Sequence, residues 1–200
     1  MPGQRESQAT RREQILEAAY EVALRRGIDG LTVRAVAARA RLSHGLVLFH
    51  FKRKDQLGLA LLDRVLAGTL SVTLPNQIRT ISKPRERLQA LVRQELQRLS
   101  EEPRRLRLLL EFWTRGGHNA VIRHKIGAGL DGYRAAFQGL VSEMTDGKTG
   151  RRGSLAGMAA VAVSLIIGHP VQAMIDRDGI GVEEYLASVE GVLEHLGIAA

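Results

Sequence analysis

The sequence predicts an all-α protein of about nine helices, in which an N-terminal three-helix domain is joined through a fourth helix to a larger helical bundle. Apolar residues recur at three- and four-residue spacing along nearly the whole chain, whereas alternating strand-like runs are sparse. With 200 residues, of which 44% are hydrophobic and 25% charged, the chain is long enough to bury a core without disulfides. We expect residues 7–55 to form the first domain and residues 56–200 the second.

The first four predicted helices are closely spaced. An apolar stripe carries the first helix as far as Gly27, which is placed to end it. Thr32 and Ser43 offer capping hydroxyls to a second helix and to a third helix over residues 43 to about 50. A fourth helix begins at Asp55 or a neighbouring residue and runs toward Leu70.

Prolines and glycines divide the rest of the chain into longer helices. Pro84 and Pro103 each fit the first turn of a helix, because the missing N–H of proline has no helical partner there in any case. The pair Gly116–Gly117 ends the second of these helices. Three further helices are predicted over residues 119–143, 152–176 and 181–197.

Composition and charge exclude several classes of function. Twenty-nine Lys and Arg residues against 21 Asp and Glu give a net charge of +8, which favours a polyanionic partner. The absence of cysteine excludes thiolate catalysis and cysteine-ligated metal sites. Aromatic residues make up only 4% of the chain, so a base-stacking sheet is improbable. The six histidines lack the spacing of a metal site, and we expect no metal, cofactor or catalytic residue.

The second and third helices match a helix-turn-helix, in which the N-terminal end of the second member enters the major groove of DNA. If Val47 and Phe51 face inward, the residues that face outward are His44, Gly45, Leu48 and part of Phe49. An outward Leu and Phe are unusual on a solvated face. They suit a DNA face, because apolar atoms can contact thymine methyl groups there.

Residues 31–57 also combine the elements Ser43-x-Gly45, His50-Phe51 and Lys52-x-Lys54. This combination resembles the DNA-binding segment of the TetR family of bacterial transcriptional regulators. Farther along, Leu110-Glu-Phe-Trp113, and Leu165-Ile-Ile-Gly168 followed by Gln172 and the Asp176–Gly181 loop, resemble the regulatory domain of the BetI-like branch.

The resemblance implies a sequence-specific regulator, most simply a repressor that a small-molecule effector releases from a palindromic operator. Many relatives carry a phosphate-binding Tyr where this chain has Leu48, so apolar readout is expected at that position. His50 also has an interpretation as a packing residue, and Lys52 and Lys54 as a solvated charge run. The resemblance, together with the outward face of the third predicted helix, implies ten DNA-binding residues. They are Thr32, Arg34, Ser43, His44, Gly45, Leu48, Phe49, His50, Lys52 and Lys54.

By the same resemblance, a pocket among the C-terminal helices binds the effector, whose identity stays open. The candidate residues are polar or polarisable side chains on otherwise apolar helix faces, although most of them also have a plain core interpretation. They are Glu95, Trp113, Tyr133, Phe137, Met158 and His169. The last two helices, about 152–197, are the most apolar and the least basic, and we expect them to form a homodimer interface.

Two other classes of function stay open. A non-specific architectural protein that binds nucleic acid would also be basic and helical, and a hydrolase can be drawn from Ser154, His169 and Asp176, although nothing fixes its geometry. The polar opening residues lack the apolar core of a signal peptide. The apolar stretch from Leu155 to Gly168 is shorter than the roughly 20 residues that span a membrane. We therefore expect a cytoplasmic protein without membrane contact.

Overall fold

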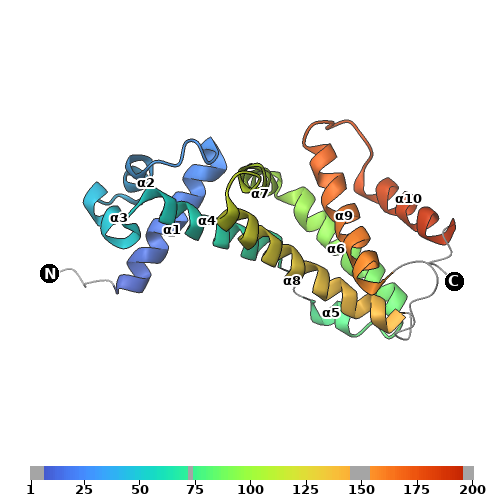
Figure 1. The fold of residues 1–200 in the computed structure, drawn as a ribbon. Helices are drawn as coiled ribbons and strands as arrows, with labels where there is room; N and C mark the ends of the chain where they lie inside the picture. The colour runs from blue at the N-terminus through green and yellow to red at the C-terminus, as the bar shows by residue number, and fades with distance from the viewer. Residues whose placement is uncertain (1–6, 72–73, 145–153, 196–200) are drawn as a thin grey trace. The chain divides into compact units, whose positions relative to one another are not determined.

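The computed structural model describes residues 7–71, 74–144 and 154–195, and within these ranges the chain is helical and has no strand (Figure 1). This confirms the all-α prediction. The ten helices are α1 (Gln8–Arg26), α2 (Val33–Ala40), α3 (His44–Phe51), α4 (Lys54–Thr69), α5 (Asn76–Arg79), α6 (Pro84–Glu101), α7 (Pro103–Gly116), α8 (Ala120–Met144), α9 (Leu155–Ala173) and α10 (Val182–His195). The one that was not predicted is α5, because a single turn is too short to show an apolar period.

The helices pack into two compact units. The first unit consists of the described residues of Met1–Thr69 together with Arg104–Gly127, and the second of the described residues of Leu70–Pro103 and Ala128–Ala200. The chain passes from one unit to the other at the end of α4, after the first residue of α7, and within α8.

In the first unit, side-chain caps begin α2 and α3 at the predicted positions. The Thr32 hydroxyl accepts the backbone N–H of Ala35 at 3.1 Å, and the Ser43 hydroxyl accepts that of Leu46 at 3.2 Å. Helix α1 packs against α2, α3 and α4. The core between them consists of fully buried side chains that include Ile15, Val36, Val47, Phe51, Leu57 and Leu61.

Three helix ends in this unit depend on unusual backbone conformations, and one of them is the end of α3 at Lys52, with φ 43° and ψ −44°. Gly27 ends α1 as predicted: its N–H donates to the carbonyl of Ala23 at 2.8 Å, and its φ of 69° with ψ of −179° lies in a region that is almost exclusive to glycine. Arg41 ends α2 in the left-handed conformation, with φ 56° and ψ 42°, where glycine is the usual residue. The turn between α2 and α3 is therefore made without a glycine.

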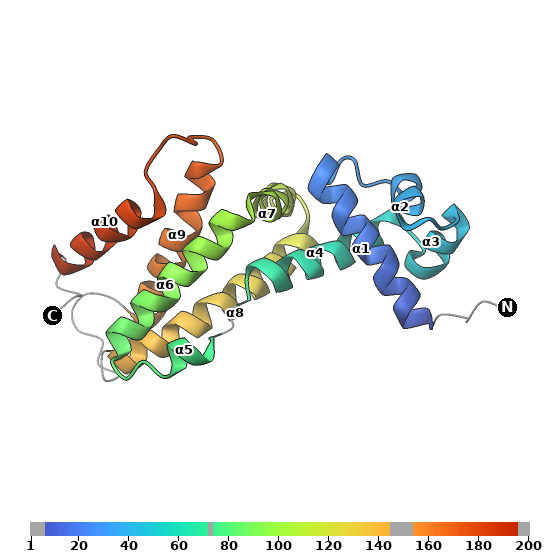
Figure 2. The same cartoon turned by 180° about the vertical axis from the view of Figure 1, so that it is seen from behind.

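In the second unit, α9 packs against α6, and α10 contacts both of these helices (Figures 1 and 2). Two hydrogen bonds attach α10 and the segment before it to α9. The hydroxyl of Tyr185 donates to the carbonyl of Leu165 at 2.9 Å, and Nε2 of His169 lies 2.8 Å from the carbonyl oxygen of Ile180. Burial raises the pKa of the Tyr185 hydroxyl, so it stays protonated and available as a donor.

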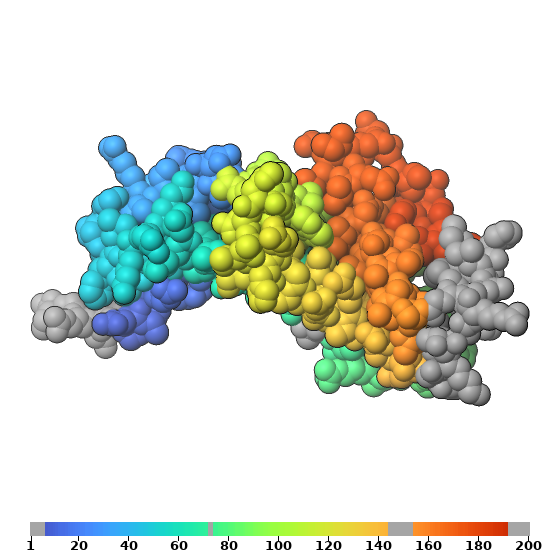
Figure 3. All heavy atoms as spheres, in the orientation of Figure 1, coloured from blue at the N-terminus to red at the C-terminus, as the bar shows by residue number. Residues whose placement is uncertain are grey.

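Helix α9 lies within the range 152–176 that the sequence predicts for it. It continues through His169 and Pro170 to Ala173, and its 19 residues are long and apolar enough, by length and composition alone, to cross a membrane. The expectation that this segment is too short to span a membrane is therefore wrong. The expectation of a buried helix is also wrong, because only 28% of its most apolar window is buried within the described chain. The exposed α9 surface is visible in orange in Figure 3.

Candidate DNA-binding and effector-binding sites

The N-terminal end of α3 lies open on the surface of the first unit. Val47 and Phe51 are buried and fix the inner face of the helix, which confirms the predicted facing. Ser43, His44 and Gly45 are exposed at its first turn, and Phe49 is 66% exposed. A helix that leaves a large aromatic ring and its first turn free has the form that a major-groove reading helix needs.

Gly45 has no packing reason to be a glycine. A Cβ atom built at this position would meet no other atom within 4 Å, and its φ is not in the left-handed region. Glycine inside a helix costs roughly 0.5–1 kcal/mol relative to alanine. The space that its missing side chain leaves lies outside the protein, where a DNA strand could approach the backbone closely.

Basic and hydroxyl side chains border α3 at both ends. Thr32 and Arg34 are exposed at the start of α2, and Lys52 and Lys54 are exposed just after α3. Lys54 is also the first residue of α4, whose unpaired N–H groups favour an anion. All ten predicted DNA-binding residues are described: Leu48 and His50 are half-buried, and Thr32, Arg34, Ser43, His44, Gly45, Phe49, Lys52 and Lys54 are exposed.

Sequence reasoning missed the part played by Arg12. Its guanidinium donates to the carbonyl of His50 at 3.0 Å and lies 4.1 Å from the centre of the Phe51 ring. Arg12 therefore holds the C-terminal end of α3 against α1. The 38 residues that separate Arg12 from His50 explain why no local pattern marks this contact.

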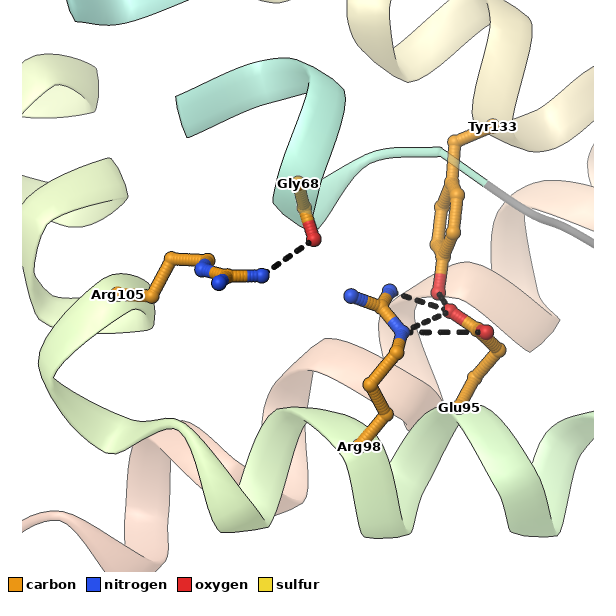
Figure 4. Close-up of polar contacts among 5 residues, drawn as sticks. All are labelled: Gly68, Glu95, Arg98, Arg105 and Tyr133. Carbon is orange, nitrogen blue, oxygen red and sulfur yellow. Dashed lines mark hydrogen bonds and ion pairs between the residues drawn. The ribbon is translucent and has the colours of Figure 1, made fainter. Parts of the chain in front are cut away.

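The second unit contains a buried polar cluster made by Glu95 and Arg98 of α6 and Tyr133 of α8 (Figure 4). The Glu95 side chain is only 1% exposed. Its Oε2 accepts the Tyr133 hydroxyl at 2.7 Å and Nη2 of Arg98 at 2.5 Å. Burial, and then the charge of Glu95, raise the pKa of the Tyr133 hydroxyl far above its usual range, so this group remains a donor.

The other predicted effector-binding residues are only partly brought together. Phe137 is buried edge-on against Tyr133, with 5.3 Å between the ring centres. His169 packs on Tyr185 at 4.6 Å, and its buried Nδ1 has no hydrogen-bond partner among the described residues. Met158 is half-buried on α9. Trp113 belongs to the first unit and is 38% exposed.

The residues from which a hydrolase could be drawn have other partners. The Ser154 hydroxyl caps α9 by accepting the N–H of Gly157 at 3.1 Å, while His169 contacts the carbonyl of Ile180. Asp176 lies on the exposed segment after α9. Within the described part of the chain, these side chains do not form a hydrogen-bonded triad.

Comparison with known proteins assigns the two halves of the chain separately. Residues 15–61 match the model of the bacterial regulatory proteins of the tetR family, and residues 84–197 match that of the C-terminal domain of BetI-type transcriptional repressors. The second match alone spans more than half of the chain.

Relatives and solved structures agree with this assignment. A helix-turn-helix transcriptional regulator from the dhlA 5' region of Xanthobacter autotrophicus is 29% identical over 96% of this chain and 93% of that protein. The regulator BetI of Burkholderia ambifaria is 30% identical over 56% of this chain and 58% of that protein. A transcriptional regulator from Saccharomonospora viridis, solved in complex with choline, shares the fold with a TM-score of 0.75 at 22% identity, over 94% of this chain and 97% of that one.

The relatives are transcriptional regulators rather than enzymes, and their shared fold begins with the same helix-turn-helix. An exposed reading helix, a matching N-terminal family model and a matching C-terminal one all lead to one assignment. The chain belongs to the TetR family of bacterial transcriptional regulators and carries a C-terminal domain of the BetI type.

Proposed function

We propose that the chain acts in the cytoplasm as a homodimeric repressor, in which residues 7–55 read a palindromic operator and residues 56–200 dimerise and bind an effector that releases the DNA. The single observation that carries the DNA-binding part is the exposed first turn of α3 with its open Gly45. The ten residues Thr32, Arg34, Ser43, His44, Gly45, Leu48, Phe49, His50, Lys52 and Lys54 form the proposed interface.

The proposed dimer is supported by the surface of α9. Val161 is 55% exposed in the middle of this apolar helix, and Gly157 and Ser164 are exposed on either side of it. Small side chains allow a second helix to approach closely, and apolar area favours a lasting contact. One eight-residue reading helix makes too few base contacts for useful specificity. Two of them, about 34–36 Å apart, read a palindrome.

The proposed effector site centres on Glu95, Tyr133 and Phe137. Glu95 and Tyr133 place polar atoms on otherwise apolar helix faces, as ligand-binding pockets do, and this supports a binding role. Met158 and His169 on α9 are further candidates, and the involvement of Trp113 stays a prediction. A structural neighbour holds choline, which makes choline the first compound to test on this chain.

Selection of bound sequences from random DNA tests the function, and it should yield one palindromic site. If each subunit neutralises about four phosphates, log affinity for that site should fall against log salt with a slope of roughly −7. If choline or another metabolite is the effector, adding it during the selection should release the protein from the selected DNA. Equal affinity for a scrambled duplex would instead favour the architectural alternative.

Gly45→Ala should separate stability from DNA binding. We expect the free energy of unfolding to rise by roughly 0.5–1 kcal/mol, because alanine favours the helix and meets no clash. Operator affinity should fall at least about tenfold, because the methyl group occupies space needed by the DNA. Thermal unfolding and fluorescence anisotropy measure the two quantities.

Gly139→Ala is the matched control, since Gly139 also lies in a helix and a Cβ there would also meet nothing within 4 Å. It should stabilise the protein similarly and leave operator affinity unchanged. A Gly45→Ala protein that binds the operator as tightly as the unaltered protein would remove α3 from the proposed interface.

A further inference from the structure

Within the first unit, four charged side chains attach α7 to the N-terminal helices, and we call them the α7 clamp: Arg105, Arg107, Glu111 and Arg115. Nε of Arg105 donates to the Tyr20 hydroxyl at 2.7 Å, and Nη1 donates to the carbonyl of Gly68 at 3.1 Å, a contact drawn in Figure 4. Arg107 donates to the carbonyl of Leu24 at 3.2 Å. The clamp therefore contacts both α1 and α4.

The remaining two clamp residues contact the turn between α1 and α2. Arg115 pairs with Asp29 at 2.5 Å, but the Asp29 side chain is almost fully exposed. Glu111 makes the stronger kind of contact: its Oε2 accepts the backbone N–H of buried Ile28 at 2.7 Å. Without Glu111 this part-buried N–H would lose its partner, which weakens the turn.

The same carboxylate closes around Gly27. A Cβ at Gly27 would lie 2.9 Å from Oε2 of Glu111 and 3.1 Å from Oε1, so a side chain at this position would displace the carboxylate. Gly27 thus serves two purposes, since its backbone conformation also excludes other residues. The contact between α7 and the α1–α2 turn explains the close approach, and the end of α1 explains the backbone conformation.

We propose that Glu111 is a positioning residue for DNA binding: it fixes the α1–α2 turn and, through this turn, the start of α2. Two backbone hydrogen bonds continue the turn from Ile28, since Leu31 donates to the carbonyl of Ile28 at 3.1 Å and Thr32 to that of Gly30 at 3.0 Å. Thr32 and Arg34, which belong to the proposed DNA interface, follow directly. This inference rests on the function proposed above.

The α7 clamp also lies close along the chain to the proposed effector site. Glu111 lies within the segment matched by the BetI-type C-terminal model, not within the N-terminal one. Only Glu102 separates α7 from α6, the helix that carries Glu95 and Arg98 of the buried polar cluster. The chain therefore leads directly from the helix of the buried polar cluster to the helix that holds the α1–α2 turn.

Two substitutions of Glu111 in the full-length protein test the inference. Glu111→Asp keeps the charge but shortens the side chain, so the carboxylate no longer reaches Ile28. Glu111→Gln keeps the reach and an accepting oxygen. We expect Glu111→Asp to weaken binding to the selected operator about tenfold without changing the salt slope, because no phosphate contact is lost. Glu111→Gln should stay within about threefold of the unaltered protein.

Hydrogen exchange measured by mass spectrometry on residues 27–32 reports the turn without DNA. Exchange there should be faster in Glu111→Asp and nearly unchanged in Glu111→Gln. Asp29→Asn is the matched control, because it breaks an exposed contact to the same turn, and it should alter neither affinity nor exchange.

Unchanged affinity or exchange in Glu111→Asp overturns the inference, and so does an equal loss in Glu111→Gln. If the unaltered protein selects no operator, the proposed function fails. The rate of hydrogen exchange at residues 27–32 then still decides whether Glu111 holds the α1–α2 turn.

Discussion

Replacing Glu95 by alanine should lower the free energy of unfolding by about 3 kcal/mol or more, a large share of the stability of a typical domain. The substitution leaves the buried Tyr133 hydroxyl without its Glu95 acceptor and removes the Glu95 carboxylate from its ion pair with Arg98. Because the Arg98 side chain is 26% exposed, water can solvate part of its charge, and the loss should stay toward the lower end of the 3–5 kcal/mol typical of broken buried pairs. Urea denaturation measures the change.

The substitution Glu95→Gln should cost less, because an amide oxygen can still accept the Tyr133 hydroxyl. Asp131→Ala is the matched control: Asp131 also pairs with an arginine three residues away, but on the surface of α8, and its loss should cost less than about 1 kcal/mol. Equal losses for Glu95→Ala and Asp131→Ala would show that the buried cluster adds no stability.

The pH dependence of this cluster follows from Tyr133. Its pKa is raised in the folded chain above the ordinary value of 10.0, which means that the folded state favours the protonated hydroxyl. The contribution of Tyr133 to stability is therefore complete below pH 10.0 and is lost as the pH rises above it. At neutral pH the cluster keeps its donor.

Features set by neighbouring residues could be predicted from the sequence. The caps at Thr32 and Ser43 act within three residues, and the end of α1 at Gly27 follows from the conformational freedom of glycine. The inward facing of Val47 and Phe51 follows from the helical period. These local rules give the helix-turn-helix and the outward face of α3.

Features that depend on distant contacts could not be predicted in this way. Arg12 meets His50 across 38 residues, and Glu111 meets Ile28 across 83. No periodic pattern encodes such a pair, and a charged residue on a helix is usually solvated. The grouping of residues 104–127 with the N-terminal helices depends on contacts of this kind.

The helix predicted over residues 152–176 continues through Pro170, and so does α9. Proline inside a helix removes a hydrogen bond and usually bends or ends the helix, yet α9 continues three residues beyond Pro170. Contacts from α10 support this region, because Tyr185 donates to Leu165 and packs on His169. Tertiary packing has outweighed the local preference, as it often does.

The largest effect on function should come from Val161→Glu, which we expect to separate the proposed dimer. Val161 is 55% exposed on the apolar face of α9, and a two-fold interface would bury it in both subunits. Each copy would then place an unpaired carboxylate in an apolar contact, near a second carboxylate of the same sign. The dissociation constant of the dimer should rise at least about a hundredfold, as measured by analytical ultracentrifugation.

Operator binding should fall with the dimer. A single subunit neutralises about half of the phosphates, so the salt slope should drop from roughly −7 to roughly −3.5. Operator affinity should decrease by a factor on the order of a thousand, the lower end of the usual interval between specific and non-specific binding. Val121→Glu is the matched control, because Val121 is a valine of nearly equal exposure, 53%, on α8. It should stay dimeric and bind DNA normally. A Val161→Glu protein that remains a dimer with an unchanged salt slope would place the interface elsewhere on the chain and leave the apolar face of α9 without its proposed partner.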